Sequence, residues 1–198
     1  MIAAATGRAE NLKLLLTDEE LRVEMLTKKN KEGKMAIHIA TENNHLDVVE
    51  TLLELGCDIH SLNTTKQTPL HLAAMLGHFE LVKFLHEKGA AISKRDKLKR
   101  TPLILVCFKN ACFPFYSHNS FKACKNGHLK IASYLLRYGA DPDEADSSEN
   151  SCIQYASAFG WKKIIPLLIE AGGDANKANA WKSTAYFPCF FFNQFSTH

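Results

Sequence analysis

The chain has 198 residues, of which 46% are hydrophobic and 23% charged, and its 24 basic and 21 acidic side chains leave a formal net charge of +3. This composition allows one ordinary globular domain, and the charge surplus is too small to predict nucleic-acid or membrane binding. No apolar run approaches the roughly 20 residues of a membrane span, and no signal-peptide pattern opens the chain. We therefore expect a cytoplasmic or nuclear protein.

The first 29 residues match the second half of a unit that recurs later in the chain. Ile2-Ala3-Ala4, Gly7 and Leu14-Leu15-Leu16 carry this match. Thr17-Asp18-Glu19-Glu20 has the form of a capping box, which predicts an extra helical turn. Because the first half of the unit is missing, we expect residues 1–29 to be a partial N-terminal repeat and the chain to be a fragment of a longer protein.

Two similar units follow at residues 30–62 and 63–95, and the second has the clearer signals. Thr68 suits a helix N-cap, and proline at the first helical position costs no hydrogen bond, so a helix is predicted to begin at Pro69. Gly77 is predicted to end this helix in a left-handed conformation. A second, amphipathic helix is predicted over 79–86 before Gly89.

The next unit, residues 96–145, opens with Thr101-Pro102-Leu103 but is interrupted. His128 follows His78 by 50 residues, where the period of the other units is 33. An insertion is therefore predicted at about 106–122, and its sequence has neither helical nor strand periodicity. It is either a genuine inserted loop or the product of a retained intron or a misplaced exon boundary.

Residues 146–178 form a degenerate unit, in which Ser151-Cys152-Ile153-Gln154 stands in place of Thr68-Pro69-Leu70-His71. Pro166 falls inside its second predicted helix, where it is expected to remove a hydrogen bond. Residues 179–198 begin a further, truncated unit and end in an aromatic tail from Phe187, whose origin is open in the same way as that of the insertion.

The 33-residue spacing separates Gly56 from Gly89 and Gly139 from Gly172, and each complete unit carries a variant of the core T-P-L-H-x-A. This pattern resembles the ankyrin repeat family over roughly residues 2–186. The resemblance implies an all-α fold, a solenoid of stacked helix-turn-helix units with short hairpin loops. Since one unit cannot cover its own apolar face, the units must stack on their neighbours.

The resemblance also implies that the chain is a non-catalytic module that binds another protein in a concave groove. In this family the groove is lined by the hairpin tips and by the exposed side of the first helices. The matching positions here are Lys31, Glu32, Lys34, Glu42, Asn43, Thr64, Thr65, Gln67, Met75, Leu76, Lys97, Leu98, Arg100, Ser147, Ser148, Asn150, Ala158 and Phe159.

The basic run from Lys94 to Arg100 lies on the hairpin between two units, near the middle of the expected groove. We therefore expect a protein partner with an acidic segment, bound to a monomeric chain, and no nucleic acid. The alternative is that the chain is the targeting or substrate-recruiting region of a larger enzyme, such as a poly(ADP-ribose) polymerase or a ubiquitin ligase. In that case the catalytic domain lies outside this sequence.

No phosphate-binding loop, nucleophile elbow or zinc-protease motif occurs in the chain, so neither catalysis nor a cofactor is predicted. Asn176, in the loop Gly172-Gly173-Asp174-Ala175-Asn176, resembles the asparagine that asparaginyl hydroxylases modify in ankyrin repeats, although an ordinary turn residue would look the same.

The six cysteines contain no C-x-x-C pair, and without secretory features they are expected to be buried or free thiols. One group has the residue types of a zinc site, but its spacing is looser than that of zinc knuckles, and we predict no metal. Its members are Cys107, Cys112, His118, Cys124 and His128.

Overall fold

The computed structural model describes residues 1–15, 19–108 and 128–186. Most of the expected insertion and the tail 187–198 lie outside these described residues. The described part of the chain contains helices, hairpins and one isolated β-bridge between Ala145 and Ser151, and no strand. Within the same ranges, no helix has both the length and the apolar character needed to cross a membrane.

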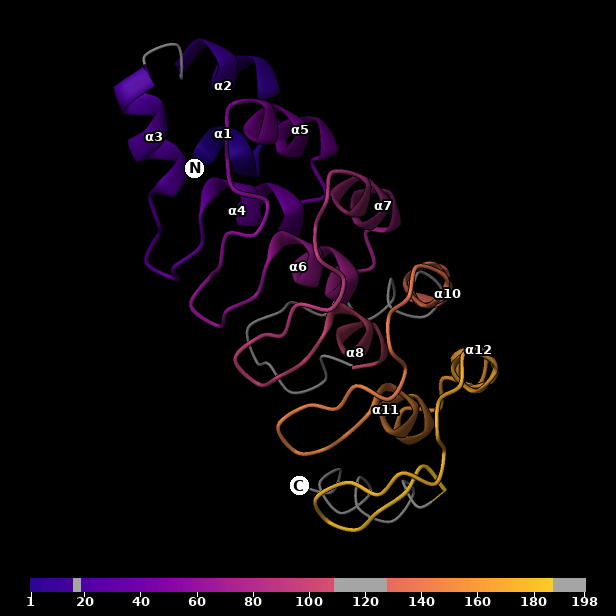
Figure 1. Ribbon diagram of the computed structural model, residues 1–198. Coiled ribbons are helices and arrows are strands. Elements are labelled where there is room, and N and C mark those ends of the chain that lie inside the picture. The colour runs from indigo at the N-terminus through magenta and orange to yellow at the C-terminus, as the bar shows by residue number, and fades with distance from the viewer. Residues whose placement is uncertain (16–18, 109–127, 187–198) are drawn as a thin grey trace, which may run out of the picture.

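The helices are arranged as successive antiparallel pairs along one axis (Figure 1). The pairs are α1 (Ile2–Ala5) with α2 (Ala9–Leu15), α4 (Ala36–Glu42) with α5 (Leu46–Glu54), α6 (Pro69–Leu76) with α7 (Phe79–Glu87), α8 (Pro102–Cys107) with α10 (His128–Arg137), and α11 (Cys152–Ala158) with α12 (Ile164–Glu170). The helix α3 (Glu19–Thr27) lies between the first two pairs in sequence.

The first helix of each pair contacts the first helix of the next, so that α1, α4, α6, α8 and α11 form one layer. The second helices form another layer beside it, in which α10 contacts both α7 and α12. The fold is therefore the expected all-α solenoid. Helix α3 has nine residues rather than a single extra turn.

The ends of α6 and α7 confirm the local predictions. Thr68 caps α6 by accepting the His71 N–H at 3.4 Å, and Pro69 is its first residue. Gly77 ends α6 with a φ of 82°, a left-handed conformation that glycine adopts at little cost. Helix α7 runs from Phe79 to Glu87, one residue beyond the predicted end.

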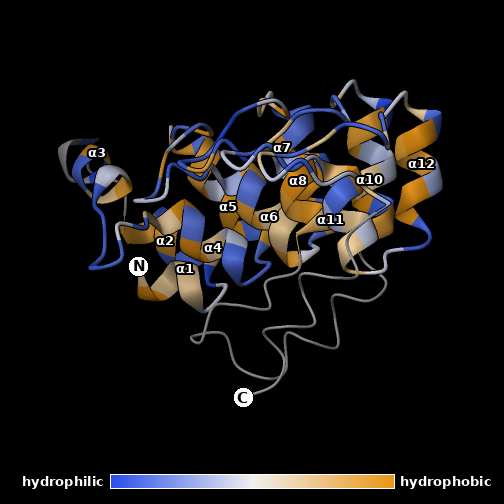
Figure 2. Ribbon diagram, turned by 90° about the horizontal axis from the view of Figure 1, so that it is seen from below, coloured by the Kyte–Doolittle hydropathy of each residue, from blue (hydrophilic) through white to orange (hydrophobic). Residues whose placement is uncertain are grey.

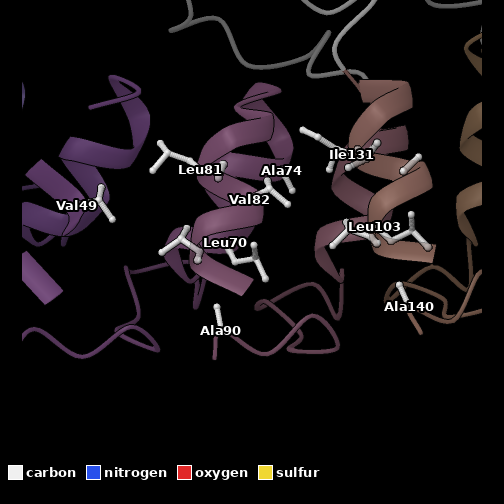
Figure 3. Packing of buried hydrophobic residues seen from close by; sticks show 14 of the residues in the cluster. Val49, Leu70, Ala74, Leu81, Val82, Ala90, Leu103, Ile131 and Ala140 are labelled. Carbon is white, nitrogen blue, oxygen red and sulfur yellow. The ribbon is translucent and has the colours of Figure 1, made fainter. Parts of the chain in front are cut away.

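A continuous apolar core lies between the two layers and joins the pairs to one another. Leu70 of α6, Leu81 of α7, Leu103 of α8 and Ile131 of α10 are each 1% exposed or less. Figure 3 shows these side chains pointing into the space between neighbouring helices. In Figure 2 the orange apolar residues recur in helices from one end of the molecule to the other, while the hairpins are mostly blue. Stability therefore depends on contacts between adjacent pairs.

Helix α12 begins later than its counterparts in the other pairs and has Pro166 in its first turn. Helices α5 and α7 begin directly after His45 and His78, whereas α12 begins three residues after Trp161, which holds the corresponding position. Pro166 is the third residue of α12, and N–H groups in the first turn of a helix have no partner within the helix, so its missing N–H removes no intrahelical hydrogen bond. The Ile165 N–H still donates to the Trp161 carbonyl at 3.4 Å. The hydrogen-bond loss that the sequence predicts therefore does not occur.

The expectation that the cysteines are free thiols is wrong for one pair. Cys107, the last residue of α8, and Cys152, the first residue of α11, form a disulfide with their Cα atoms 5.6 Å apart. They are 45 residues apart in sequence and meet because α8 and α11 stack on each other. Cys107 is therefore not available as a metal ligand. Cys112, His118 and Cys124 of the considered zinc set lie outside the described residues.

Cys57 is buried and has no disulfide partner among the residues that the structure describes. Burial raises the pKa of its thiol to about 11, because a buried thiolate loses its hydration. This cysteine therefore agrees with the expectation of a buried thiol.

Candidate binding surface

Five hairpins project from the same side of the solenoid, and each begins with an asparagine or aspartate. The side-chain oxygen of that first residue accepts hydrogen bonds of 2.8–3.0 Å from the N–H groups two and four residues later. The local bonding therefore fixes the shape of each hairpin. The five hairpins are 30–34, 63–67, 96–100, 146–150 and 179–183.

Successive hairpins are bonded directly to one another. The Lys97 N–H donates to the Thr65 carbonyl at 2.9 Å, and the Ser147 N–H donates to the Leu98 carbonyl at 2.8 Å. A similar bond of 3.2 Å joins Ala180 to Ser148. The tips therefore form a continuous row, visible along one side of the molecule in Figure 1. We call this row, with the inner-helix residues beside it, the hairpin surface.

Buried side chains of the inner helices hold the hairpins from below. His71 Nδ1 accepts the Thr68 N–H at 3.2 Å, and its Nε2 lies 3.2 Å from the Arg100 carbonyl of the next hairpin. His38 makes the same kind of link to the carbonyl groups of Ser61 and Gln67. These histidines are structural, as their place in the repeat predicts.

In α11 a glutamine takes the place of the histidine. Gln154 Oε1 accepts the Ser151 N–H at 2.7 Å, and Nε2 donates to the carbonyl groups of Lys177 and Ser183 at 2.9 and 3.0 Å. The amide thus supplies one acceptor and one donor group in the same arrangement as the imidazole. The degenerate unit therefore keeps the link to its following hairpin.

Acidification is expected to destabilise the protein through His71. Burial lowers the pKa of His71 to about 4, from about 6.5 in an unfolded chain. At pH values between these two pKa values, His71 binds a proton in the unfolded state but not in the folded state. The free energy of unfolding therefore falls as the pH falls. We expect the free energy of unfolding to drop by about 2 kcal/mol from this residue between pH 7 and pH 5.

Urea unfolding at both pH values measures this loss. The matched variant is His71→Gln, because Gln154 shows that an amide can make the same bonds without titrating. His38, whose pKa is also lowered by burial, remains in the variant and retains its own share of the pH dependence. A variant with the full pH dependence of the parent would show that His71 does not contribute.

Most of the residues predicted to line the groove are accessible. Lys31, Glu32, Asn43, Thr64, Thr65, Lys97, Leu98 and Ser147 are exposed, and Lys34, Glu42, Met75, Leu76, Ser148, Asn150, Ala158 and Phe159 are half-buried. Leu98 is 49% exposed at the tip of its hairpin, unusual for a large apolar side chain. All of these residues lie on the hairpins or on the ends of α4, α6 and α11 or directly after them.

Gln67 and Arg100 differ from the expectation, because both side chains are buried. Arg100 is 7% exposed, and its Nε and Nη2 donate to Asp96 Oδ2 at 2.9 and 2.7 Å. Its guanidinium group also lies over the Phe108 ring, 5.3 Å from the centroid. Gln67 Oε1 accepts a hydrogen bond from Asn63 Nδ2 at 3.3 Å, and its Nε2 donates to Asp96 Oδ2 at 3.4 Å. These two residues hold the hairpins together. They are therefore no longer counted among the residues available to contact a partner.

Lys34 is also engaged within the chain. Its Nζ lies 2.8 Å from Glu32 and 2.9 Å from Glu42. The ammonium group beside Glu32 holds the pKa of that carboxyl below its usual value. The positive charge of Lys34 is therefore compensated within the chain.

A cluster of three aromatic side chains, Phe108, Tyr155 and Phe159, lies next to the third and fourth hairpins. Phe108 meets the Tyr155 ring edge-on with centroids 5.1 Å apart, and Tyr155 stacks on Phe159 at 6.2 Å. The Tyr155 hydroxyl donates to Asp146 Oδ2 at 2.5 Å, and burial raises the pKa of this tyrosine. Only Phe159 of this cluster was predicted. Phe108 could have been found as the counterpart of Met75.

Asn176 is exposed in the loop after α12, and its N–H donates to Asp174 Oδ1 at 2.8 Å. This is a local turn of the kind that any asparagine can occupy. The position is accessible, and its modification stays a prediction.

The relatives of the chain share short regions with it. Protein fem-1 homolog A of Rattus norvegicus is 40% identical over 58 residues, 29% of this chain and 9% of that protein. Protein fem-1 homolog C of Danio rerio is 32% identical over 87 residues, 40% of this chain and 14% of that protein. Ankyrin repeat domain-containing protein 63 of Homo sapiens is 35% identical over 49 residues, 25% of this chain and 13% of that protein. The chain thus spans 9–14% of the length of these relatives.

Two family models cover most of the chain. The model of ankyrin repeats in three copies matches residues 1–63 and 55–114, and the model of ankyrin repeats in many copies matches residues 120–169. The matched ranges contain all of the helix pairs except the last residue of α12. With its stacked helix pairs and linked hairpins, this chain belongs to the ankyrin repeat family.

Proposed function

We propose that the chain is a non-catalytic module that binds a protein partner on the hairpin surface. Ankyrin repeats are generally protein-interaction modules, and the family assignment supports this class of function. The observation that supports the location is Leu98. It is 49% exposed at the centre of a row of hairpins that are already fixed by hydrogen bonds to each other. A preorganised surface loses little conformational entropy on binding, which favours affinity.

The proposal keeps the repeat boundaries that the sequence predicts and places the protein, as a monomer, in the cytoplasm or nucleus. The groove would be formed by the exposed hairpin residues together with Met75, Leu76 and Phe159. Large apolar and aromatic side chains of this kind contribute most to interface energies. Asn176 is the proposed site of hydroxylation.

Capture of partners from a cell extract tests the location of the site. Leu98→Glu places a charge at the proposed centre of the interface without touching the core. Ile169→Glu is the matched control, because Ile169 is 52% exposed on α12, away from the hairpins. A specific partner should be recovered with the parent chain and with Ile169→Glu and be lost with Leu98→Glu. Equal recovery with both variants would place the interface elsewhere.

A second candidate function is that of the targeting or substrate-recruiting region of a larger enzyme. We consider this function because the region matched by the chain covers only 9% and 14% of two of its relatives. Extension of the gene sequence in both directions, followed by a search for a catalytic domain, decides between the two.

A further inference from the structure

The fourth residue of every hairpin has a left-handed backbone conformation. Gly33 holds this position in the first hairpin with a φ of 70°. In the other four hairpins the position is occupied by residues with long side chains, Lys66, Lys99, Glu149 and Lys182, at φ values of 58–60°. Such residues pay a steric cost there that glycine avoids. Side chains kept at strained positions are candidates for a functional role.

The second and third hairpins carry a positive charge that the chain does not neutralise. Lys66, Lys97 and Lys99 are exposed. Within the described residues, their ammonium groups take part in no ion pair. The acidic group nearest to Lys97 and Lys99 in sequence, Asp96, is committed elsewhere because it pairs with Arg100. The three lysines therefore form an uncompensated basic cluster, which we call the lysine track.

The two hairpins of the lysine track are direct neighbours. The bond from the Lys97 N–H to the Thr65 carbonyl fixes their spacing. Stacked helices lie about 8–10 Å apart, which is the length of one turn of an extended polyproline II peptide, in which three residues make a turn and side chains three residues apart share a face. Exposed Leu98 lies between Lys97 and Lys99 and offers an apolar contact within the charged row. Glu149, at the equivalent place on the fourth hairpin, ends the track with the opposite charge.

We propose that the lysine track binds an extended acidic segment of a partner protein, with acidic side chains at intervals of about three residues. The proposal rests on the proposed function and adds the chemistry of the partner. The exposed Leu98 favours a peptide over a nucleic acid, because a peptide can place an apolar side chain against it while a phosphate backbone cannot. Arg100, which the sequence places in the same basic patch, has no part in it because its guanidinium group is paired with Asp96.

A synthetic peptide tests the proposal on the purified full chain. The probe is a fluorescent 12-residue peptide with glutamate at every third position and one central leucine, and a 12-nucleotide single-stranded oligothymidylate is the competing class. The test variant is Lys66→Gly with Lys99→Gly. The controls are Glu149→Gly, which changes the same backbone position but removes a negative charge, and Lys130→Ala, which removes an exposed lysine from α10.

The parent chain should bind the peptide, and the double variant should bind it about fivefold more weakly at low salt, with less dependence on ionic strength. Lys130→Ala should leave the affinity unchanged, and Glu149→Gly should increase it. Because glycine relieves the left-handed strain, Glu149→Gly should raise the midpoint of thermal unfolding by about 2 °C, and the double variant, which relieves two such positions, should raise it by about 4 °C.

Three results would overturn the proposal. The first is that the parent chain does not bind the peptide. The second is that the double variant binds it as tightly as Lys130→Ala does. The third is that the oligothymidylate binds more tightly than the peptide and depends on the same lysines. None of these results affects the capture experiment with Leu98→Glu, so failure of the lysine track is distinguishable from failure of the hairpin surface as a protein-binding site.

Discussion

Replacing Asp96 by alanine is expected to lower the free energy of unfolding by about 3–5 kcal/mol. Asp96 is buried, and its Oδ1 accepts the N–H groups of Leu98 and Arg100, each at 2.9 Å. Its Oδ2 accepts two bonds from the Arg100 guanidinium group. Alanine would leave that buried cation without its partner and would remove the bonds that shape the hairpin. Urea unfolding at pH 7 measures the loss.

The chain itself supplies the matched variants. The second hairpin has Asn63 and Gln67 at the places of Asp96 and Arg100, and Asn63 Oδ1 makes the same two bonds to backbone N–H groups. Asp96→Asn should therefore keep the hairpin but still leave Arg100 unpaired. Asp96→Asn with Arg100→Gln recreates the neutral pair and should recover most of the stability. If the double variant is no more stable than Asp96→Asn, the buried ion pair is not the source of the loss.

Reduction of the Cys107–Cys152 disulfide is expected to lower the free energy of unfolding by about 2–4 kcal/mol. The bond joins residues 45 positions apart and ties α8 to α11. It restricts the unfolded chain and links two units at an interface where α8 has Ile104 at the position that His71 holds in α6. No polar side chain at that position reaches the next hairpin. Urea unfolding with and without a phosphine reductant measures the effect.

Cys152→Ala should make the urea midpoint insensitive to the reductant, whereas Cys57→Ala should leave the sensitivity of the parent intact. Cys57 is the control because it is buried and, in the described part of the chain, forms no disulfide. An identical midpoint for the oxidised and reduced parent protein would contradict the prediction. In the cytoplasm or nucleus, where thiols are kept reduced, the expected consequence is a less stable attachment of α11 and α12.

The candidate surface was only partly predictable. The sequence places Lys97 and Leu98 on a hairpin tip, and they are exposed there. It places Arg100 beside them with the same apparent role, but this side chain turns inward to Asp96. Charge patterns show which residues could face solvent. They do not show which of two neighbouring cations finds an intramolecular partner.

The sequence by itself determined the ankyrin repeat pattern and the ends of α6. Thr68 with Pro69 starts α6 and Gly77 ends it, because capping and left-handed turns depend on atoms only a few residues apart. Only the tertiary structure decided that Cys107 meets Cys152 and that Gln154 bonds to the hairpin of the following unit. These contacts join residues 23–45 positions apart, and they exist only once apolar packing has stacked one helix pair on the next.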